Sequence, residues 1–293
     1  LVGSEMCIRD RKYIMISTNE RSTTGTNKKI SVIMGVYNQN NFRILFDAVN
    51  SILNQTYSNF EFLIYNDGSN PEVSEELLRL SGLDKRIRIL SSAENHGLAY
   101  ALNVCIDNAD GEYIARMDDD DISLPDRFEK QINFLENNPQ YSWCGTSALL
   151  FDNSGIWGRR IMVEIPEAAD YLRYSPYIHP SVMFRSDALR KAGGYHSSVR
   201  TLRCEDYELF MRMTMDGYKG FNLQLPLFMY REDINNVHRR KLRFRIDETR
   251  LRLCYFRKLS ILFPFGWIYV LRPLAGFFIP DFLLHHIKRN ETA

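Results

Sequence analysis

The sequence predicts an α/β fold in which a Rossmann-like mixed sheet is flanked by helices. Three observations favour it. Between residues 30 and 117, short β-branched apolar runs alternate with segments of helical periodicity. The apolar runs are typical of buried strands, and polar residues follow directly after them. The 293 residues, 45% hydrophobic and 25% charged, suffice for one large domain or two small ones. The formal net charge of +1 favours no polyanionic partner, and we expect no nucleic-acid partner.

The first half of the chain is predicted to form strands and helices in alternation. β-branched and aromatic runs predict strands at residues 30–36, 60–65, 87–90 and 112–117. Apolar residues at helical spacing predict helices at residues 44–53, 71–80 and 97–109. Strands that alternate with helices imply right-handed crossover connections and a sheet that is mostly parallel in this part. In sheets of this kind, ligands bind beyond the carboxyl ends of the strands.

The alternation weakens in the second half. Beyond Pro125 a helix is expected to about Asn137, and residues 141–151 are predicted to form a core strand, after which prolines punctuate the chain. Composition divides the sequence into a leader (1–29), a main domain (30–230) and a basic and apolar C-terminal extension (231–293) that is expected to be helical. The leader is expected to be disordered or non-native, since much of it is polar and rich in Ser, Thr and Asn.

Four consecutive aspartates, Asp118 to Asp121, follow the fourth predicted strand directly. Two charges ~4 Å apart repel by about 1 kcal/mol in water and about 4 kcal/mol at an effective dielectric constant of 20, so the cluster needs compensation unless it is a solvated acidic loop. Strand pleating predicts that Asp118 and Asp120 face one ligand while Asp119 and Asp121 point elsewhere. Carboxylate oxygens select Mg²⁺ or Mn²⁺, and such an ion suggests a nucleotide diphosphate as partner.

An ordered set of motifs resembles family 2 glycosyltransferases over roughly residues 30–230. The segments that carry the resemblance are ISVIMGVYNQ, LIYNDGS, ENHGLAYALN, DGEYIARMDDDDISLPDRFEKQ and CEDYELFMRM. The resemblance implies a GT-A fold, a DxD metal motif, and inverting transfer of a sugar from a nucleotide-diphosphate-sugar to an acceptor hydroxyl. It also suggests a role in bacterial cell-surface polysaccharide or lipopolysaccharide biosynthesis.

The resemblance assigns the donor site to four positions near the strand ends. It implies that Tyr37 lies near the nucleobase, that Asp67 hydrogen-bonds to it, and that Gly97 starts a helix near the donor. Arg116 is a candidate contact for the diphosphate or the sugar, and a surface arginine is the alternative interpretation.

The metal site and the catalytic base also follow from the resemblance. The DxD motif maps to Asp118 and Asp120, with Asp118 shared between ribose and metal, although the family often has Ala where this chain has Asp119. The pair Glu205 and Asp206 matches the family's ED motif, which makes Asp206 the expected general base. The alternative for this pair is two acids that favour the dipole of the following helix.

His179 matches a family position near the donor diphosphate or the acceptor, and a structural histidine is the alternative. Two other functions stay open: a sugar-nucleotide nucleotidylyltransferase, whose usual Gly-rich, basic loop is missing from GVYNQNN, and a catalytically silent nucleotide-sugar-binding module. The five cysteines form no CxxC pair and predict a reducing compartment, in keeping with a cytoplasmic protein.

The extension combines charge and apolarity. Residues 231–258 hold ten Arg or Lys against four acids, and residues 259–271 are uncharged but shorter than the ~20 residues of a membrane span. Either the extension lies on an anionic membrane surface at the inner face of the membrane, or it packs on the core. A glycan or lipid-linked acceptor is expected.

Overall fold

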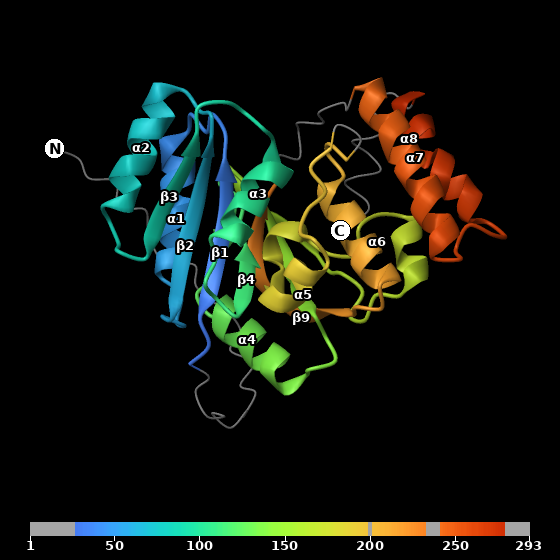
Figure 1. Cartoon of the computed structure of the whole chain (residues 1–293), viewed down its shortest axis with the longest axis horizontal. Coiled ribbons are helices and arrows are strands. Elements are labelled where there is room, and N and C mark those ends of the chain that lie inside the picture. Colours follow the sequence, from blue (N-terminus) through green and yellow to red (C-terminus); the bar gives the residue numbers. More distant parts are fainter. Residues whose placement is uncertain (1–26, 199–200, 233–240, 279–293) are drawn as a thin grey trace.

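The computed structural model describes residues 27–198, 201–232 and 241–278. Within these described ranges, nine strands form a single sheet in the order β3-β2-β1-β4-β8-β6-β9-β5, with β7 paired to β6 (Figure 1). The strands are β1 (Ile30–Val36), β2 (Phe60–Asp67), β3 (Ile87–Ser92), β4 (Tyr113–Arg116), β5 (Ile122–Ser123), β6 (Trp143–Asp152), β7 (Gly155–Arg160), β8 (Met183–Arg185) and β9 (Gly220–Arg231). The predicted mixed sheet flanked by helices is confirmed.

The first four strands in sheet order are parallel, as the alternation predicted. β1 pairs in parallel with both β2 and β4, and β2 pairs in parallel with β3. Helices connect them: α1 (Phe42–Leu53), α2 (Pro71–Ser81) and α3 (Leu98–Asp107). Asn41 and Asn70 begin α1 and α2, and each side-chain oxygen accepts a backbone N–H of the first turn. These elements lie within a few residues of their predicted bounds.

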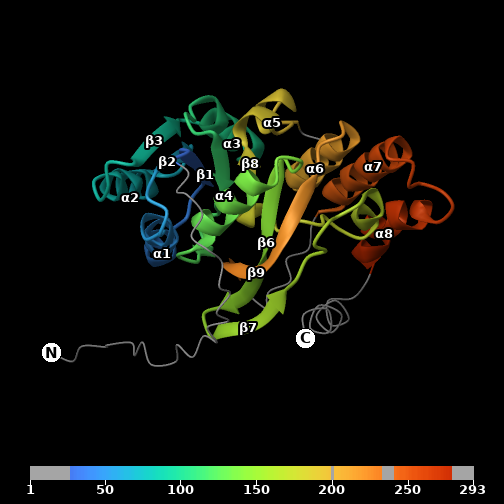
Figure 2. The ribbon, with the colours of Figure 1, turned by 90° about the horizontal axis from the view of Figure 1, so that it is seen from below.

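The second half of the sheet is different, because most of its pairs are antiparallel. β8 pairs antiparallel with β4 and β6, β7 with β6, and β5 with β9, whereas β6 and β9 run parallel to each other. Figure 2 shows β6 and β9 side by side, with β7 at the rim of the sheet. The two-residue β5 and three-residue β8 are too short to produce a periodic pattern, so the sequence did not indicate them.

Helices cover both faces of the sheet and pack on it with their apolar sides. One core joins strand residues such as Val32 and Ile64 to α1, α2 and α4 (Arg127–Asn137), and the other joins Ile33 and Leu63 to α3, α5 (Ser186–Lys191) and α6 (Glu205–Met215). Alternate residues along a strand serve opposite cores, which explains why the strand sequences are continuously apolar. Cys105 and Cys144 are fully buried within these cores.

Two helices end the described chain: α7 (Leu242–Lys258) and α8 (Gly266–Phe278), which pack against each other as a hairpin. Figure 1 shows this hairpin beside α6, at the opposite side of the molecule from α2. The short 3₁₀ helices η1 (Ala168–Leu172) and η2 (His179–Ser181) lie between β7 and β8 in the chain. In the described part of the chain, no helix is both long and apolar enough to cross a bilayer. Most of the predicted leader, residues 1–26, lies outside the described residues.

Candidate functional site

The predicted donor residues lie at or just beyond the carboxyl ends of neighbouring parallel strands. Tyr37 follows β1, Asp67 ends β2, and Asp118 comes two residues after β4 ends. β1 is hydrogen-bonded to both β2 and β4, so these positions share one edge of the sheet. The Tyr37 side chain is 53% exposed, which leaves its ring accessible to a ligand.

The carboxylate of Asp67 is used within the protein. It is 3% exposed and accepts hydrogen bonds from the backbone N–H groups of His96 (2.9 Å) and Gly97 (2.8 Å) and from the Asn95 amide (2.9 Å). These bonds tie the end of β2 to the loop that begins α3. The contacts favour a role for Asp67 in shaping that loop over direct contact with a base.

Two glycines make this loop arrangement possible. Gly68 has φ +69°, and a Cβ atom there would lie 2.5 Å from the backbone carbon of Glu94. Gly97 has φ +90° as the residue that precedes α3, a conformation that side chains rarely adopt. Substitution at either position would displace the loop that Asp67 holds.

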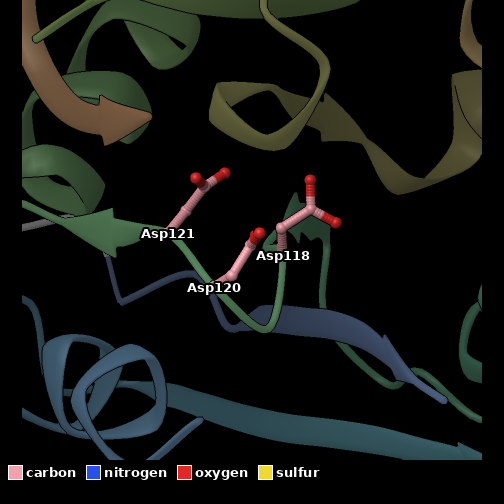
Figure 3. A group of neighbouring side chains, drawn as sticks. All are labelled: Asp118, Asp120 and Asp121. Atoms are coloured by element: carbon pink, nitrogen blue, oxygen red, sulfur yellow. The ribbon is translucent and has the colours of Figure 1, made fainter. Parts of the chain in front are cut away.

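The four aspartates form a turn rather than a continuation of the strand. β4 ends at Arg116, so the alternation of strand side chains does not extend to Asp121. Carboxylate oxygens of Asp118, Asp120 and Asp121 lie within 4.8 Å of one another. Figure 3 shows these three side chains rising from one turn with their carboxylates on the same side. The expectation that Asp121 points away from Asp118 and Asp120 was therefore wrong.

Burial and mutual repulsion disfavour negative charge on the aspartate turn. Burial, followed by repulsion from Asp118, raises the pKa of Asp119 to about 7 and that of Asp120 to about 6. Burial also raises the pKa of Asp121 well above its usual value, and the charges of Asp118 and Asp120 add to this shift. Charge in this turn is therefore costly unless a positive ligand compensates for it.

Asp121 contributes an unpaired buried oxygen. Its Oδ1 accepts the backbone N–H of Arg231 at 2.7 Å, which fixes the turn to the end of β9, whereas its Oδ2 is buried without a hydrogen-bond partner. The residue is 1% exposed, and an isolated buried carboxylate oxygen is unfavourable. Three oxygen donors, one of them unsatisfied, suit a hard divalent cation.

Arg116 lies buried beneath this turn, so the interpretation as a surface arginine was wrong. It is 1% exposed, its guanidinium contacts the carboxylate of Asp118, and its Nε has no hydrogen-bond partner. Despite burial, nearby acidic charges, chiefly that of Asp118, raise its pKa. The site therefore holds a permanent positive charge next to the acidic turn.

His179 and Tyr195 form a pair behind Arg116. The Nε2 atom of His179 and the Tyr195 hydroxyl lie 2.7 Å apart, and burial followed by the Arg116 charge lowers the pKa of His179 well below its usual value. Burial raises the pKa of Tyr195; Arg116 opposes this, whereas Asp206 and then Asp118 add to it. The pKa of Tyr195 is thus affected by the charges of both the aspartate turn and the Glu205–Asp206 pair.

Glu205 and Asp206 occupy the first turn of α6, where acids also favour the helix dipole. Glu205 is 9% exposed, and burial raises its pKa. A cavity of about 270 Å³ lies between this turn and the start of α3, and its lining includes Gly97, Leu202 and Glu205. The structure therefore brings the predicted donor loop and the predicted ED motif to one hollow.

Comparisons with known proteins agree with this arrangement. Residues 31–197 match the family described as Glycosyl transferase family 2. The chain is 38% identical over 269 residues to the putative glycosyltransferase EpsE of Bacillus subtilis (strain 168), covering 89% of this chain and 94% of that protein. It is 34% identical over 209 residues to the O-antigen biosynthesis glycosyltransferase WbnJ of Escherichia coli, covering 69% of this chain and 79% of that one.

A solved structure shares the fold. The mannosyltransferase PcManGT from Pyrobaculum calidifontis, determined in complex with GDP-Man and Mn²⁺, aligns with a TM-score of 0.57 at 16% identity, over 85% of this chain and 74% of that chain. This likeness supports the predicted GT-A fold, and the family match disfavours a nucleotidylyltransferase. The matched segment includes the aspartate turn, and on these grounds the chain belongs to glycosyl transferase family 2.

Proposed function

We propose that this chain transfers a sugar, with inversion, from a nucleotide-diphosphate-sugar to an acceptor hydroxyl, with Mn²⁺ or Mg²⁺ held by the aspartate turn. One observation carries the proposal: the unpaired, buried Oδ2 of Asp121 lies in a group of three carboxylates at the carboxyl end of β4. The arrangement has the oxygen donor atoms that a divalent cation requires. Asp121 thus joins Asp118 and Asp120 as a candidate ligand.

The donor is proposed to lie along the strand ends. The exposed ring of Tyr37 offers a surface on which a nucleobase can stack, and Gly97 lets the backbone of its loop come close to the donor. Asp67 supports this site by holding the Asn95–Gly97 loop. Asp118 contacts the ribose as well as the cation.

Arg116 is proposed to meet the donor's diphosphate. Its guanidinium is buried, charged and only partly hydrogen-bonded, so an anionic group that displaced part of its contact with Asp118 would be strongly held. His179 is proposed to border the same region, with its ring oriented by Tyr195. A bound divalent cation would neutralise charge on the departing nucleoside diphosphate.

Asp206 is proposed as the general base. It is partly exposed in the first turn of α6. The charge of Asp206 affects the pKa of Tyr195, as do the charges of Arg116 and Asp118. A base in this place can take the proton of an acceptor hydroxyl as its oxygen attacks the anomeric carbon. Glu205, which lines the cavity beside it, is proposed to bind the substrate.

The acceptor is proposed to be a glycan or a lipid-linked glycan in the assembly of bacterial cell-surface polysaccharide or lipopolysaccharide. The named role of the Escherichia coli relative in O-antigen biosynthesis supports this class. We further propose that the protein works in the cytoplasm, at the inner face of the membrane.

A thermal-shift panel tests the donor and the metal together. UDP-, GDP- and dTDP-sugars, each with Mn²⁺ or with EDTA, should give a metal-dependent rise in Tm for one nucleotide family, because a ligand at 100 times its Kd stabilises by about 2.7 kcal/mol. Asp120→Asn and Asp121→Asn should abolish the rise, whereas the exposed Asp187→Asn should preserve it. An undiminished metal response in both site variants would remove the aspartate turn as the cation site.

A further inference from the structure

The α7–α8 hairpin presents a face that no described element covers. On α7 the exposed residues Arg250, Leu253, Cys254, Arg257 and Lys258 recur at helical spacing and therefore form one stripe. On α8, exposed residues recur in the same manner: Trp267, Ile268, Leu271, Arg272 and Ala275. We call these two stripes, with the exposed connecting residues 260 and 263–265, the outer face of the hairpin.

The outer face includes several exposed apolar residues. Phe263 and Phe265 are 77% and 68% exposed in the connection, and Trp267, Ile268 and Leu271 are each about half exposed on α8. Large apolar side chains that are this exposed and this close in the chain are unusual on a monomeric surface. They mark a place where something else binds.

The charged residues of the outer face are all basic. Among described residues 241–278, the exposed charged side chains are all Lys or Arg: Lys241, Arg243, Arg250, Arg257, Lys258 and Arg272. The acids of the same segment, Asp247 and Glu248, are each 8% exposed and form ion pairs with Arg250 and Arg252 respectively. The fold thus turns the negative charges inward and the positive charges outward.

We propose that the outer face docks on an anionic lipid bilayer, with its aromatic residues in the headgroup region and its basic residues on lipid phosphates. Exposed Trp and Phe beside Lys and Arg are the combination that such an interface favours. A second copy of the chain would bring two positive faces together and is therefore disfavoured. This docking goes beyond glycosyl transfer and can be measured without any substrate.

The inner face of the hairpin is fixed to the domain, which fits such docking. The Tyr255 hydroxyl donates to Glu208 of α6, and Arg252 Nη1 donates to the carbonyl oxygen of Leu172 in η1 at 2.8 Å. One face of the hairpin thus packs on the main domain, as one of the two expectations for the extension stated, while the outer face stays exposed. A bilayer bound to the outer face would hold α6, and with it Asp206, in a defined orientation to the membrane.

Vesicle co-sedimentation of the full chain tests the proposal. We expect binding to phosphatidylcholine vesicles that contain 30% phosphatidylglycerol, weaker binding at high salt, and little binding to pure phosphatidylcholine. Arg257→Gln with Lys258→Gln should weaken binding about 25-fold, or about fivefold per charge. Phe265→Ser with Trp267→Ser should weaken it by about tenfold or more. The exposed Leu83→Ser, placed just beyond α2, is the matched control and should bind like the parent.

Trp267 supplies an independent readout, because Trp143 is fully buried and Trp157 donates to the Glu232 carbonyl oxygen. In the Trp157→Phe background, Trp267 emission should shift to the blue on anionic vesicles. Absence of binding, or binding that both double variants leave unchanged, would overturn the proposal. A dimer that Trp267→Ser converts to monomer would assign the face to a second copy. Loss of binding only on removal of residues 279–293 would assign the lipid contact to that segment.

Discussion

Among the described residues, two of the buried charged clusters are built in opposite ways. At the junction of α6 and α7, Glu208 is 2% exposed and accepts hydrogen bonds from Arg212 Nε at 2.9 Å and from the Tyr255 hydroxyl, while His196 Nδ1 lies 2.9 Å away. In the aspartate turn, Asp121 is as deeply buried but leaves its Oδ2 unpaired.

The difference separates structure from function. A buried carboxylate that is fully paired stabilises the contact between elements, and removing its partners is costly. One that is left unpaired is unfavourable, and a bound cation would supply the missing interaction. The junction of α6 and α7 is therefore structural, whereas the unpaired oxygen of Asp121 supports the cation site proposed for the aspartate turn. Helix α6 carries Glu208 of the structural cluster and, two residues earlier, Asp206, the proposed general base.

The largest effect is expected from Asp206→Asn. Loss of a general base should lower kcat about 10²- to 10⁴-fold while donor affinity and stability stay nearly unchanged. Steady-state kinetics with the donor identified by thermal shift, together with urea unfolding, measures both quantities. Asp216→Asn, at the exposed end of the same helix, is the control. A variant that keeps most of its kcat would exclude Asp206 as the base.

Glu208→Gln should do the reverse. The substitution leaves Arg212 buried without its counter-charge, so the free energy of unfolding should fall by about 3 kcal/mol. Urea denaturation checks this value, and kcat of the protein that remains folded should change little. The exposed Glu164→Gln serves as the control. A loss below about 0.5 kcal/mol would show that the α6–α7 cluster is not a structural one.

A smaller effect should appear as a dependence of stability on pH. The folded-state pKa values of Asp119 (about 7) and Asp120 (about 6) lie above the ~3.9 of an unfolded aspartate, so the folded protein binds more protons between these limits. In EDTA, these groups should therefore lower the free energy of unfolding as the pH rises from 5 to 8, by at most about 1.4 kcal/mol per pH unit for each proton.

Mn²⁺ should reduce that loss, because it replaces the protons that the turn would otherwise bind. The rise in Tm on adding Mn²⁺ should thus be larger at pH 8 than at pH 5, and Asp120→Asn should diminish the difference. Thermal unfolding at four pH values, with and without the ion, provides the comparison. An equal rise at pH 5 and pH 8 would mean that the cation binds elsewhere.

Much of the fold followed from local patterns, because parallel strands buried on both faces are continuously apolar and their helices are amphipathic. This logic located β1 to β4 and their helices, and the ordered motifs indicated the family. It failed for β5 and β8, which exist only through pairing with distant strands, and it did not indicate β7 or β9. The domain boundary at residue 230 and the roles of the site residues remain predictions.

The sequence by itself determined the α/β alternation, the run of acidic residues after β4 and the basic, apolar character of the extension, since each is a property of neighbouring residues. Only the tertiary structure decided that Asp121 joins Asp118 and Asp120, that Arg116 is buried, and that Tyr195 pairs with His179. These relations depend on where β4 ends and on which distant segments pack there. Burial and charge pairing arise from contacts across the fold, which no local pattern encodes.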